Sequence, residues 1–463
     1  MIRSAEGVVV VGAGWAGIAA CFAASNAGIP AILLERTDRC LGTGLVGGIM
    51  RNNGRFTATE EAVAMGAGRL FAVADSSARH VGVDFPGHKH ASLYDTTKVE
   101  ALARRLLEEV GVKVMYETRV VNVLTEHRPT HAQRIVRSVV TERGEEIAGA
   151  AFVDATGSAG PQRNCQKYGR GCAMCVLRCA SFGPRIGIVG KAGGLEVVAT
   201  NSLGTKGSMS GSCKLLKGSL DPWVRQALDE TGVVLVPIPS RFKLREEKLI
   251  KACQQYDLPE YYDNMVLLDT GEAKLMMSYF PLPKLRQIPG FENATYADPY
   301  AGGRGNSVRH MSIAFRDHAM RVDGFENLFC CGEKSGPLVG HTEGIVTGLL
   351  AGYNAASYIL GRKPLVLPTS IAIGDFVRVT GDASRSEEGL RQRFTFSGSI
   401  YFERMKTLGL YTVDIKAIRR RVEEAGLMGV FTGGEDVEGK SGYYGENKVN
   451  RIGVPRRGSK IIG

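Results

Sequence analysis

The stretch from residue 6 to residue 35 constrains the fold of this chain more than any other. Val8 to Val11 form a short β-branched run, as a buried parallel strand requires, and Gly12, Gly14 and Gly17 follow with Gly-x-Gly-x-x-Gly spacing. The first glycine permits a tight turn, the second lets a pyrophosphate approach the backbone, and the third lets the following helix pack closely on the strand. Phosphates then lie at the helix N-terminus, where free N–H groups and the helix dipole favour anions. The stretch therefore predicts a site for an adenine dinucleotide.

A second apolar run ends at Glu35, whose carboxylate is placed to accept hydrogen bonds from a ribose 2′-hydroxyl. The same carboxylate would repel a 2′-phosphate, so the sequence disfavours NADP. Residues 7–25 carry no charge and are mostly apolar, which is also typical of a membrane span or a signal peptide. The glycines at turn spacing, the absence of a basic leader at Ser4-Ala5-Glu6 and the second strand argue against both.

The nucleotide domain is predicted to be discontinuous. Asp95-Thr96-Thr97 is expected to cap a helix over 99–110, and Glu142-Arg143-Gly144-Glu145 is expected to form a hairpin turn. Asn327 to Glu333 reads as a further buried strand, followed by a Gly- and Ala-rich helix from about Glu343 to Leu360. Further strands are expected at 112–114, 120–124, 135–141 and 151–157. The fold class is α/β, with a doubly wound Rossmann-like sheet.

Three segments resemble the FAD contacts of the glutathione-reductase-like flavoprotein superfamily: the glycine motif with Glu35, the strand end Asp154-Ala155-Thr156-Gly157, and Leu328 to Glu333. In that superfamily the third segment usually ends Gly-Asp, whereas this chain has the longer Glu333. Residues 327–364, with Gly340-His341-Thr342-Glu343-Gly344, are similar to the closing segment of the tRNA-uridine-modifying flavoproteins. Residues 41–48 resemble a broad group of FAD-dependent oxidoreductases.

The resemblance implies bound FAD and a set of contact residues spread over both halves of the domain. These are Gly12, Gly14, Trp15, Ala16, Gly17, Glu35, Arg36, Thr43, Val120, Ala155, Thr156, Gly157, Gly332, Glu333, Glu343, Gly344 and Ile345. Cys330 and Cys331 lie on the strand before Gly332, and because adjacent residues of a strand face opposite sides, at most one can point to the cofactor.

Composition agrees with an enzyme-sized protein of several domains. The chain has 463 residues, of which 44% are hydrophobic and 23% charged. Its net charge is 58 − 47 = +11, which favours anionic partners such as dinucleotides, polyanionic substrates or RNA without choosing among them. No basic leader and no other long uncharged stretch is present, which predicts a cytoplasmic protein whose cysteines stay mostly reduced.

Four of the ten cysteines are crowded into one short segment, with the spacing Cys-x6-Cys-x2-Cys-x3-Cys. Thiolates in short loops suit a metal ion or an iron–sulfur cluster, which could exchange single electrons with a flavin. Two alternatives stay open: a redox dithiol formed by Cys172 and Cys175, or structural cysteines that act as small hydrophobes. The candidate ligands are Cys165, Cys172, Cys175 and Cys179.

Candidate catalytic groups lie in two other segments. Arg304, in a basic glycine-rich loop, and His310 occupy the part of the chain where related flavoproteins bring residues to the flavin. His310 or His341 could act as a general acid or base at neutral pH. His341 begins a helix whose dipole can stabilise a negatively charged reduced flavin, a role that needs only the backbone.

Four parts are expected. Residues 1–160 and 296–365 form the FAD-binding domain, residues 161–295 form a mixed α/β substrate or cap domain with the cysteine cluster, and residues 366–463 form a helical region with a flexible tail. Helices are expected at 223–231, 244–255 and within 385–426, where Arg419-Arg420-Arg421 fall in one helix. Lysines of the cap, such as Lys214, are by default a solvated face.

These observations predict a FAD-dependent oxidoreductase that passes hydride or electrons to a small-molecule substrate. Its electron donor is expected to be NADH or a reduced protein, and the chain is expected to form a homo-oligomer and to make no membrane contact. The alternative is a flavoenzyme that modifies RNA uridines, which is possible but not favoured, because no interleaved aromatic platform is visible for RNA bases. A non-enzymatic scaffold stabilised by FAD is a third interpretation.

Overall fold

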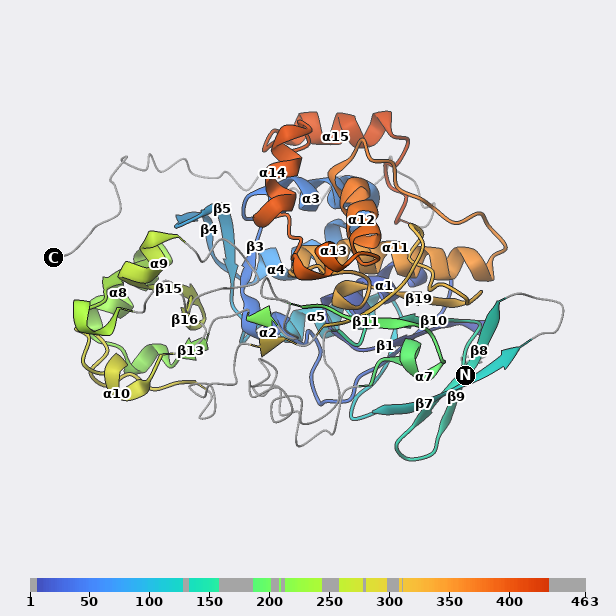
Figure 1. Ribbon diagram of the computed structural model, residues 1–463, viewed down its shortest axis with the longest axis horizontal. Helices are drawn as coiled ribbons and strands as arrows, with labels where there is room; N and C mark the ends of the chain where they lie inside the picture. Colours follow the sequence, from blue (N-terminus) through green and yellow to red (C-terminus); the bar gives the residue numbers. More distant parts are fainter. Residues whose placement is uncertain are drawn as a thin grey trace.

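The computed structural model describes residues 6–127, 133–157, 186–200, 208–209, 213–243, 258–277, 280–297, 308–309 and 311–432. Its centre is a five-stranded parallel sheet in the order β19-β10-β1-β2-β6 (Figure 1). The strands are β1 (Val8–Val11), β2 (Ala31–Leu34), β6 (Lys113–Met115), β10 (Ala151–Asp154) and β19 (Leu328–Cys330). The chain runs outward from β1 to β2 and β6, and then returns to β10 on the other side. This reversal creates a switch point between β1 and β10, where open α/β sheets bind ligands.

Helices cover one face of this sheet. They are α1 (Trp15–Asn26), α5 (Val99–Glu109) and α11 (His341–Ile359). Helices α1 and α11 pack closely because α11 carries glycine at the contact: a Cβ on Gly348 would lie 2.1 Å from the Ala16 carbonyl oxygen, and one on Gly352 would lie 2.0 Å from that of Ala20. The close packing sets the N-termini of both helices at the same edge of the sheet.

The other face carries a three-stranded antiparallel sheet of β7 (Val120–His127), β8 (Arg134–Thr141) and β9 (Glu146–Ala148), with α7 (Ile188–Lys191) beside it. Val9 and Val11 of β1 are buried against Val123 and Val139 of this sheet. The turn between β8 and β9 has Gly144 at φ +78°, so the predicted hairpin is confirmed.

The cap is built on a four-stranded antiparallel sheet in the order β13-β16-β15-β14. Its elements are β13 (Cys213–Leu215), η4 (Lys217–Ser219), α8 (Pro222–Thr231), β14 (Val233–Pro237), η5 (Ser240–Phe242), α9 (Pro259–Asp263), β15 (Asn264–Thr270), β16 (Glu272–Leu275) and α10 (Leu282–Leu285). In Figure 1 this unit lies to the left of the parallel sheet. Two short antiparallel pairs accompany it: β11 (Glu196–Val198) with β18 (Ser312–Ala314), and β12 (Ser208–Met209) with β17 (Val308–Arg309).

A small sheet from the first part of the chain joins the cap to the nucleotide-binding half. It consists of β3 (Ile49–Met50), β5 (His88–Tyr94) and β4 (Ala78–Phe85). Val83, Phe85 and Leu93 from this sheet pack against Val266 and Leu268 of β15 in one hydrophobic cluster. Residues 49–94 therefore contact the cap core although they lie within the predicted first FAD segment.

The C-terminal helices are α12 (Ala372–Ala383), α13 (Glu387–Arg391), α14 (Ser399–Thr407) and α15 (Ile415–Glu424). Residues of α12, α14 and α15 share the main core with an earlier helical stretch, formed by α3 (Gly54–Ala62), η2 (Val63–Ala67) and α4 (Gly68–Ser76). Glu61 of α3 is buried and accepts hydrogen bonds from the Ala372 and Ile373 N–H groups at the start of α12. The carboxylate thus satisfies free backbone donors at a helix N-terminus.

The predicted α/β class is confirmed, and among the described residues no helix is long and apolar enough to cross a membrane. One local expectation is wrong. Helix α5 begins at Val99 with Lys98 as its cap residue, and the Asp95 carboxylate accepts instead from the Thr97 N–H, within the preceding turn. The helix expected at 244–255 and the tail beyond residue 432 lie outside the described residues.

Candidate functional site

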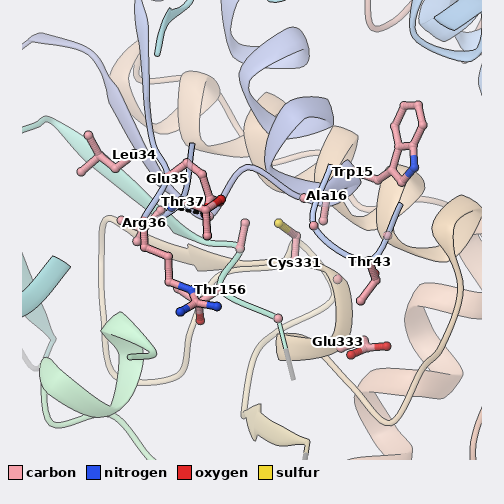
Figure 2. A pocket seen from close by; sticks show the side chains of 18 of the residues that line it. Trp15, Ala16, Leu34, Glu35, Arg36, Thr37, Thr43, Thr156, Cys331 and Glu333 are labelled. Atoms are coloured by element: carbon pink, nitrogen blue, oxygen red, sulfur yellow. Dashed lines mark hydrogen bonds between the residues drawn. The ribbon is translucent and has the colours of Figure 1, made fainter. Parts of the chain in front are cut away.

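A cleft that is partly open to solvent runs along the carboxyl ends of β1, β2, β10 and β19. All of the predicted FAD contacts line it except Gly17, Glu343 and Ile345, and so does His341. Figure 2 shows Glu35, Arg36 and Thr37 at one end of the cleft and Trp15 and Thr43 at the other. The cleft thus spans the switch point and has the length and polarity expected for a dinucleotide. Further lining residues that were not among the predicted FAD contacts are Val11, Leu34, Thr37, Gly42, Thr118, Arg119, Ile186, Cys331 and Gly340.

The three motif glycines fall into two physical classes. Gly12 has φ +103°, and a Cβ there would lie 2.5 Å from the Ala155 carbonyl oxygen, while a Cβ on Gly17 would lie 1.9 Å from the Gly12 carbonyl oxygen. Both glycines are required by the protein's own packing. Gly14 differs, because its φ is −69° and a Cβ there would meet nothing within 4 Å. The space beside Gly14 belongs to the cleft, at the N-terminus of α1 where a pyrophosphate would lie.

Glu35 is held at the nucleoside end by three hydrogen bonds. Its Oε2 accepts from the Ala13 N–H at 2.9 Å, and its Oε1 accepts from the N–H and the hydroxyl of Thr37, each at 2.9 Å. A carboxylate has about four acceptor positions, so capacity remains for a ribose hydroxyl. The fixed orientation means that the group need not lose side-chain freedom when it binds.

The strand ends on the other side of the switch point are shaped by a buried aspartate. The Asp154 carboxylate accepts from the Thr156 N–H at 3.1 Å, from the Thr156 hydroxyl at 2.6 Å and from the Val189 N–H at 3.0 Å. Asp154 therefore acts within the protein, and it presents Ala155, Thr156 and Gly157 to the cleft.

Only one of the adjacent cysteines faces the cleft, as predicted. Cys331 lines it, whereas Cys330 is buried on the opposite face with β7 and β8. Burial raises the pKa of the Cys331 thiol well above its usual value, so the thiol stays protonated and is a poor nucleophile. The next residues form η8 (Gly332–Lys334), and Gly332 donates its N–H to the Thr347 hydroxyl at 2.9 Å.

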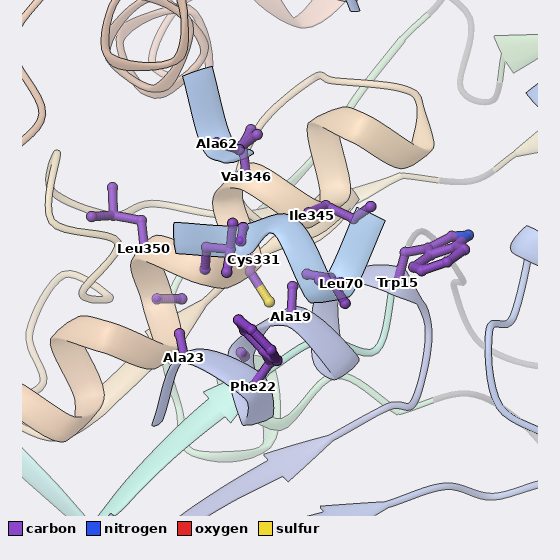
Figure 3. Close-up of a cluster of buried hydrophobic side chains, with 14 of the residues drawn as sticks. Trp15, Ala19, Phe22, Ala23, Ala62, Leu70, Cys331, Ile345, Val346 and Leu350 are labelled. Atoms are coloured by element: carbon purple, nitrogen blue, oxygen red, sulfur yellow. The ribbon is translucent and has the colours of Figure 1, made fainter. Parts of the chain in front are cut away.

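The opposite end of the cleft contains a donor without an acceptor. Trp15 is 3% exposed, and among the described residues its indole Nε1–H has no hydrogen-bond partner. Figure 3 shows its ring at the end of the α1 and α11 interface, beyond Leu70 and Ile345. A buried N–H without a partner is costly, so a polar atom of a bound ligand would fit here. This orphan donor and the empty space beside Gly14 both fit a bound dinucleotide.

Glu343 and Ile345 lie beside the cleft without lining it. Glu343 is fully buried, pairs with Arg55 at 3.0 Å, and accepts from the Thr395 hydroxyl at 2.6 Å and from the Phe396 N–H at 2.9 Å. The carboxylate therefore ties the start of α11 to the C-terminal segment, and Ile345 packs in the main core.

Two lysines of the cap contact a short helix that directly follows the lining residues Gly42 and Thr43. This helix is α2 (Gly44–Gly47), whose terminal carbonyl groups need donors. Lys214 donates to the Leu45 carbonyl at 2.5 Å and to the Thr96 hydroxyl at 2.6 Å, and Lys274 donates to the Val46 and Gly47 carbonyls. Burial lowers the pKa of Lys214 to about 8. Lys214 is thus a structural clamp between cap and cleft, and its interpretation as a solvated surface lysine is wrong.

The remaining predicted site residues, Arg304, His310, Cys165, Cys172, Cys175 and Cys179, lie outside the described residues. No cluster of metal-ligating side chains occurs within the described ranges.

Comparisons with known proteins match two separate parts of the chain. Residues 7–160 match the family described as FAD dependent oxidoreductase. Residues 273–363 match Glucose inhibited division protein A. Both segments contribute to the cleft, and together they support the expected FAD.

Curated relatives align over short stretches. The methylenetetrahydrofolate–tRNA-(uracil-5-)-methyltransferase TrmFO of Ruegeria sp. is 36% identical over 99 residues, which is 21% of this chain and 22% of that protein. The tRNA uridine 5-carboxymethylaminomethyl modification enzyme MnmG of Mycoplasmopsis synoviae is 29% identical over 116 residues, which is 25% of this chain and 18% of that protein. The alignments thus span about a fifth of the length of these relatives.

The fold is shared over a much longer stretch. A solved structure of Aquifex aeolicus GidA superposes with a TM-score of 0.59, at 16% identity, over 90% of this chain and 76% of that chain. This shows that the chain has a GidA-like, Rossmann-like fold. Membership of the glutathione-reductase-like superfamily stays a prediction.

Proposed function

We propose that this protein is a FAD-dependent enzyme whose cleft holds the dinucleotide across the ends of β1, β2, β10 and β19. The observation that carries the proposal is Gly14, a motif glycine that neither its backbone conformation nor its neighbours require. A glycine at that position is explained when a ligand occupies the space, as a pyrophosphate at the N-terminus of α1 would. The matches over 7–160 and 273–363 support FAD as that ligand.

The chain supplies binding and orientation at three points. The α1 N-terminus would hold the pyrophosphate, Glu35 would accept from the ribose, and the segment with Glu333, His341 and Gly344 would surround the reactive end. When bound, FAD supplies hydride or single-electron transfer, and the protein sets position and electrostatics. The N-terminus of α11 directs its positive dipole end toward this part of the cleft, which favours negative charge there.

Uridine modification in RNA is the second candidate function. Its support is the match of residues 273–363 to Glucose inhibited division protein A, together with relatives that act on tRNA. The comparisons support an RNA substrate at least as well as the small molecule that the sequence analysis favoured. A net charge of +11 is consistent with an RNA partner.

Three measurements test these proposals in order. Protein purified under anaerobic conditions is expected to release FAD on denaturation, identified by its mass. The flavin bound to the intact protein is expected to be reduced by NADH or another donor. Binding of unmodified tRNA is then measured at several salt concentrations, and tRNA incubated with methylenetetrahydrofolate and a reductant is analysed for modified uridine. Absence of FAD binding would overturn the first proposal. FAD binding with no tRNA binding at low salt would remove the second.

A further inference from the structure

Three side chains from distant parts of the chain, Trp15, Tyr94 and His341, meet at one end of the cleft, where Trp15 and His341 line it. Tyr94 of β5 is fully buried, and its hydroxyl donates to the Gly44 carbonyl of α2 at 2.6 Å. The same hydroxyl oxygen lies 3.4 Å from His341 Nδ1, and the Trp15 and Tyr94 rings meet edge to face with centroids 6.3 Å apart. All three residues lie at the end of the cleft where Trp15 has its unpaired N–H.

The glycines of α2 provide the space that two of these rings occupy. A Cβ on Gly47 would lie 1.7 Å from His341 Cε1, and a Cβ on Gly44 would lie 2.6 Å from Trp15 Nε1. Neither glycine has a positive φ, so the backbone does not require them. Their small size is explained by the rings, and the histidine position is therefore specified by the sequence of α2 as well as by that of α11.

The Tyr94 hydroxyl has one proton to give. A carbonyl oxygen only accepts, so the 2.6 Å bond to Gly44 uses that proton. Burial raises the pKa of Tyr94 to about 12, so the hydroxyl is not ionised at neutral pH. Toward His341 the Tyr94 oxygen can then act only as an acceptor, and the donor must be His341 Nδ1–H.

We propose that Tyr94 is a positioning residue that holds neutral His341 in its Nδ1–H tautomer, which leaves the lone pair on Nε2. The inference rests on the proposed function, in which the cleft holds FAD and His341 is among the residues around its reactive end. His341 in this tautomer accepts a proton through Nε2, as a general base does, and does not donate one from that atom. Two cationic side chains lie on the elements packed against it: Arg55 pairs with the Glu343 carboxylate, whereas Lys274 donates to the neutral carbonyls of α2.

The test reads the tautomer directly in the flavin-free protein. Imidazole ¹⁵N shifts of His341, assigned with His341→Gln, are expected to show Nδ1–H in the wild type at a pH where the ring is neutral. Tyr94→Phe keeps the aromatic ring and removes the acceptor, so the Nδ1–H population relative to Nε2–H is expected to fall by roughly three- to tenfold, the effect of one ordinary hydrogen bond. Tyr401→Phe is the matched control, because Tyr401 is also buried and donates to a helix carbonyl, that of Ala372 at 2.8 Å.

Wild-type protein in the Nε2–H form, or an unchanged tautomer ratio in Tyr94→Phe, would overturn the proposal. An equal shift in Tyr401→Phe would also overturn it, since the effect would then be a general loss of packing. FAD affinity is measured separately on the same proteins. A wild type that fails to bind FAD contradicts the proposed function, whereas the tautomer result is independent of bound flavin.

Discussion

Replacing Gly14 by valine separates ligand binding from folding. Apart from its chain neighbours, a Cβ on residue 14 would meet no described atom within 4 Å, and φ is −69°, so we expect valine to fit the flavin-free protein. Gly14 is the N-cap residue of α1, where a β-branched apolar side chain is less favourable than glycine by about 1 kcal/mol at most. We therefore expect the free energy of unfolding of the flavin-free variant to change by no more than about 1 kcal/mol.

Binding of FAD is expected to fall much further. The valine side chain would fill the space beside the α1 N-terminus and move a pyrophosphate away from the backbone N–H groups. Each charge-assisted hydrogen bond contributes about 1.5–3 kcal/mol, so the loss of two weakens binding by about 3 kcal/mol or more. That corresponds to an increase in Kd of roughly 100-fold or greater.

Gly17→Ala is the contrasting variant. Its Cβ would lie 1.9 Å from the Gly12 carbonyl oxygen, which forces α1 away from the turn, and we expect a loss of about 3 kcal/mol of stability even without ligand. Urea unfolding of the flavin-free proteins and titration with FAD measure both effects. The reasoning is refuted if Gly14→Val binds FAD as tightly as the wild type, or if it destabilises the flavin-free protein as much as Gly17→Ala does.

Four further predictions follow from particular contacts. Glu35→Ala is expected to weaken FAD binding by roughly 1–3 kcal/mol in the same titration, and an unchanged Kd would remove the ribose role. Burial raises the pKa of Glu61 to about 7; because the folded value exceeds the unfolded one, the contribution of this group to stability is present below pH 4.5 and is lost as the pH rises through 7. In urea unfolding, the free energy of unfolding of the wild type should therefore fall by about 3 kcal/mol relative to that of Glu61→Gln between pH 4.5 and pH 8. A pH-independent difference between the two proteins would contradict this prediction. If tRNA binds, Arg420→Glu on the exposed face of α15 should make tRNA affinity less dependent on salt concentration. Replacing Arg69, an exposed arginine of α4, by glutamate is the control and should leave this dependence unchanged. Equal slopes in both variants would exclude α15 as the contact. Single Cys→Ser variants of Cys165, Cys172, Cys175 and Cys179 should each release metal from anaerobic protein without releasing FAD. Wild-type protein that contains neither iron nor zinc would contradict the metal hypothesis.

The cofactor cleft was predictable because its residues follow strand ends. In a parallel sheet the carboxyl ends of all strands meet at one edge, so Gly12, Glu35, Ala155 and Gly332 had to converge once the strands were recognised. The alternation of faces along β19 likewise allowed only one of two adjacent cysteines to reach the cleft. Local periodicity was sufficient for this part of the site.

The direction of a buried polar side chain was not predictable in the same way. Glu343 stands one turn from the cleft on α11, but its carboxylate turns to Arg55 and Thr395, which are far away in the sequence. Lys214 and Lys274 each occupy a position between apolar residues on a strand, and alternation alone places such residues on a solvated face. Their burial depends on the carbonyls of α2, a contact between segments about 170 and 230 residues apart.

The two family matches leave a central part of the chain uncovered. The FAD dependent oxidoreductase match ends at residue 160 and the Glucose inhibited division protein A match begins at residue 273, so residues 161–272 belong to neither. This interval carries the cysteine cluster, Lys214 and three of the four strands of the cap sheet. Both matched segments contribute residues to the cleft, and their likeness supports FAD as its proposed ligand. Because Lys214 joins the unmatched interval to α2, whose Gly47 lies against His341, we expect substrate specificity to change in variants of residues 161–272.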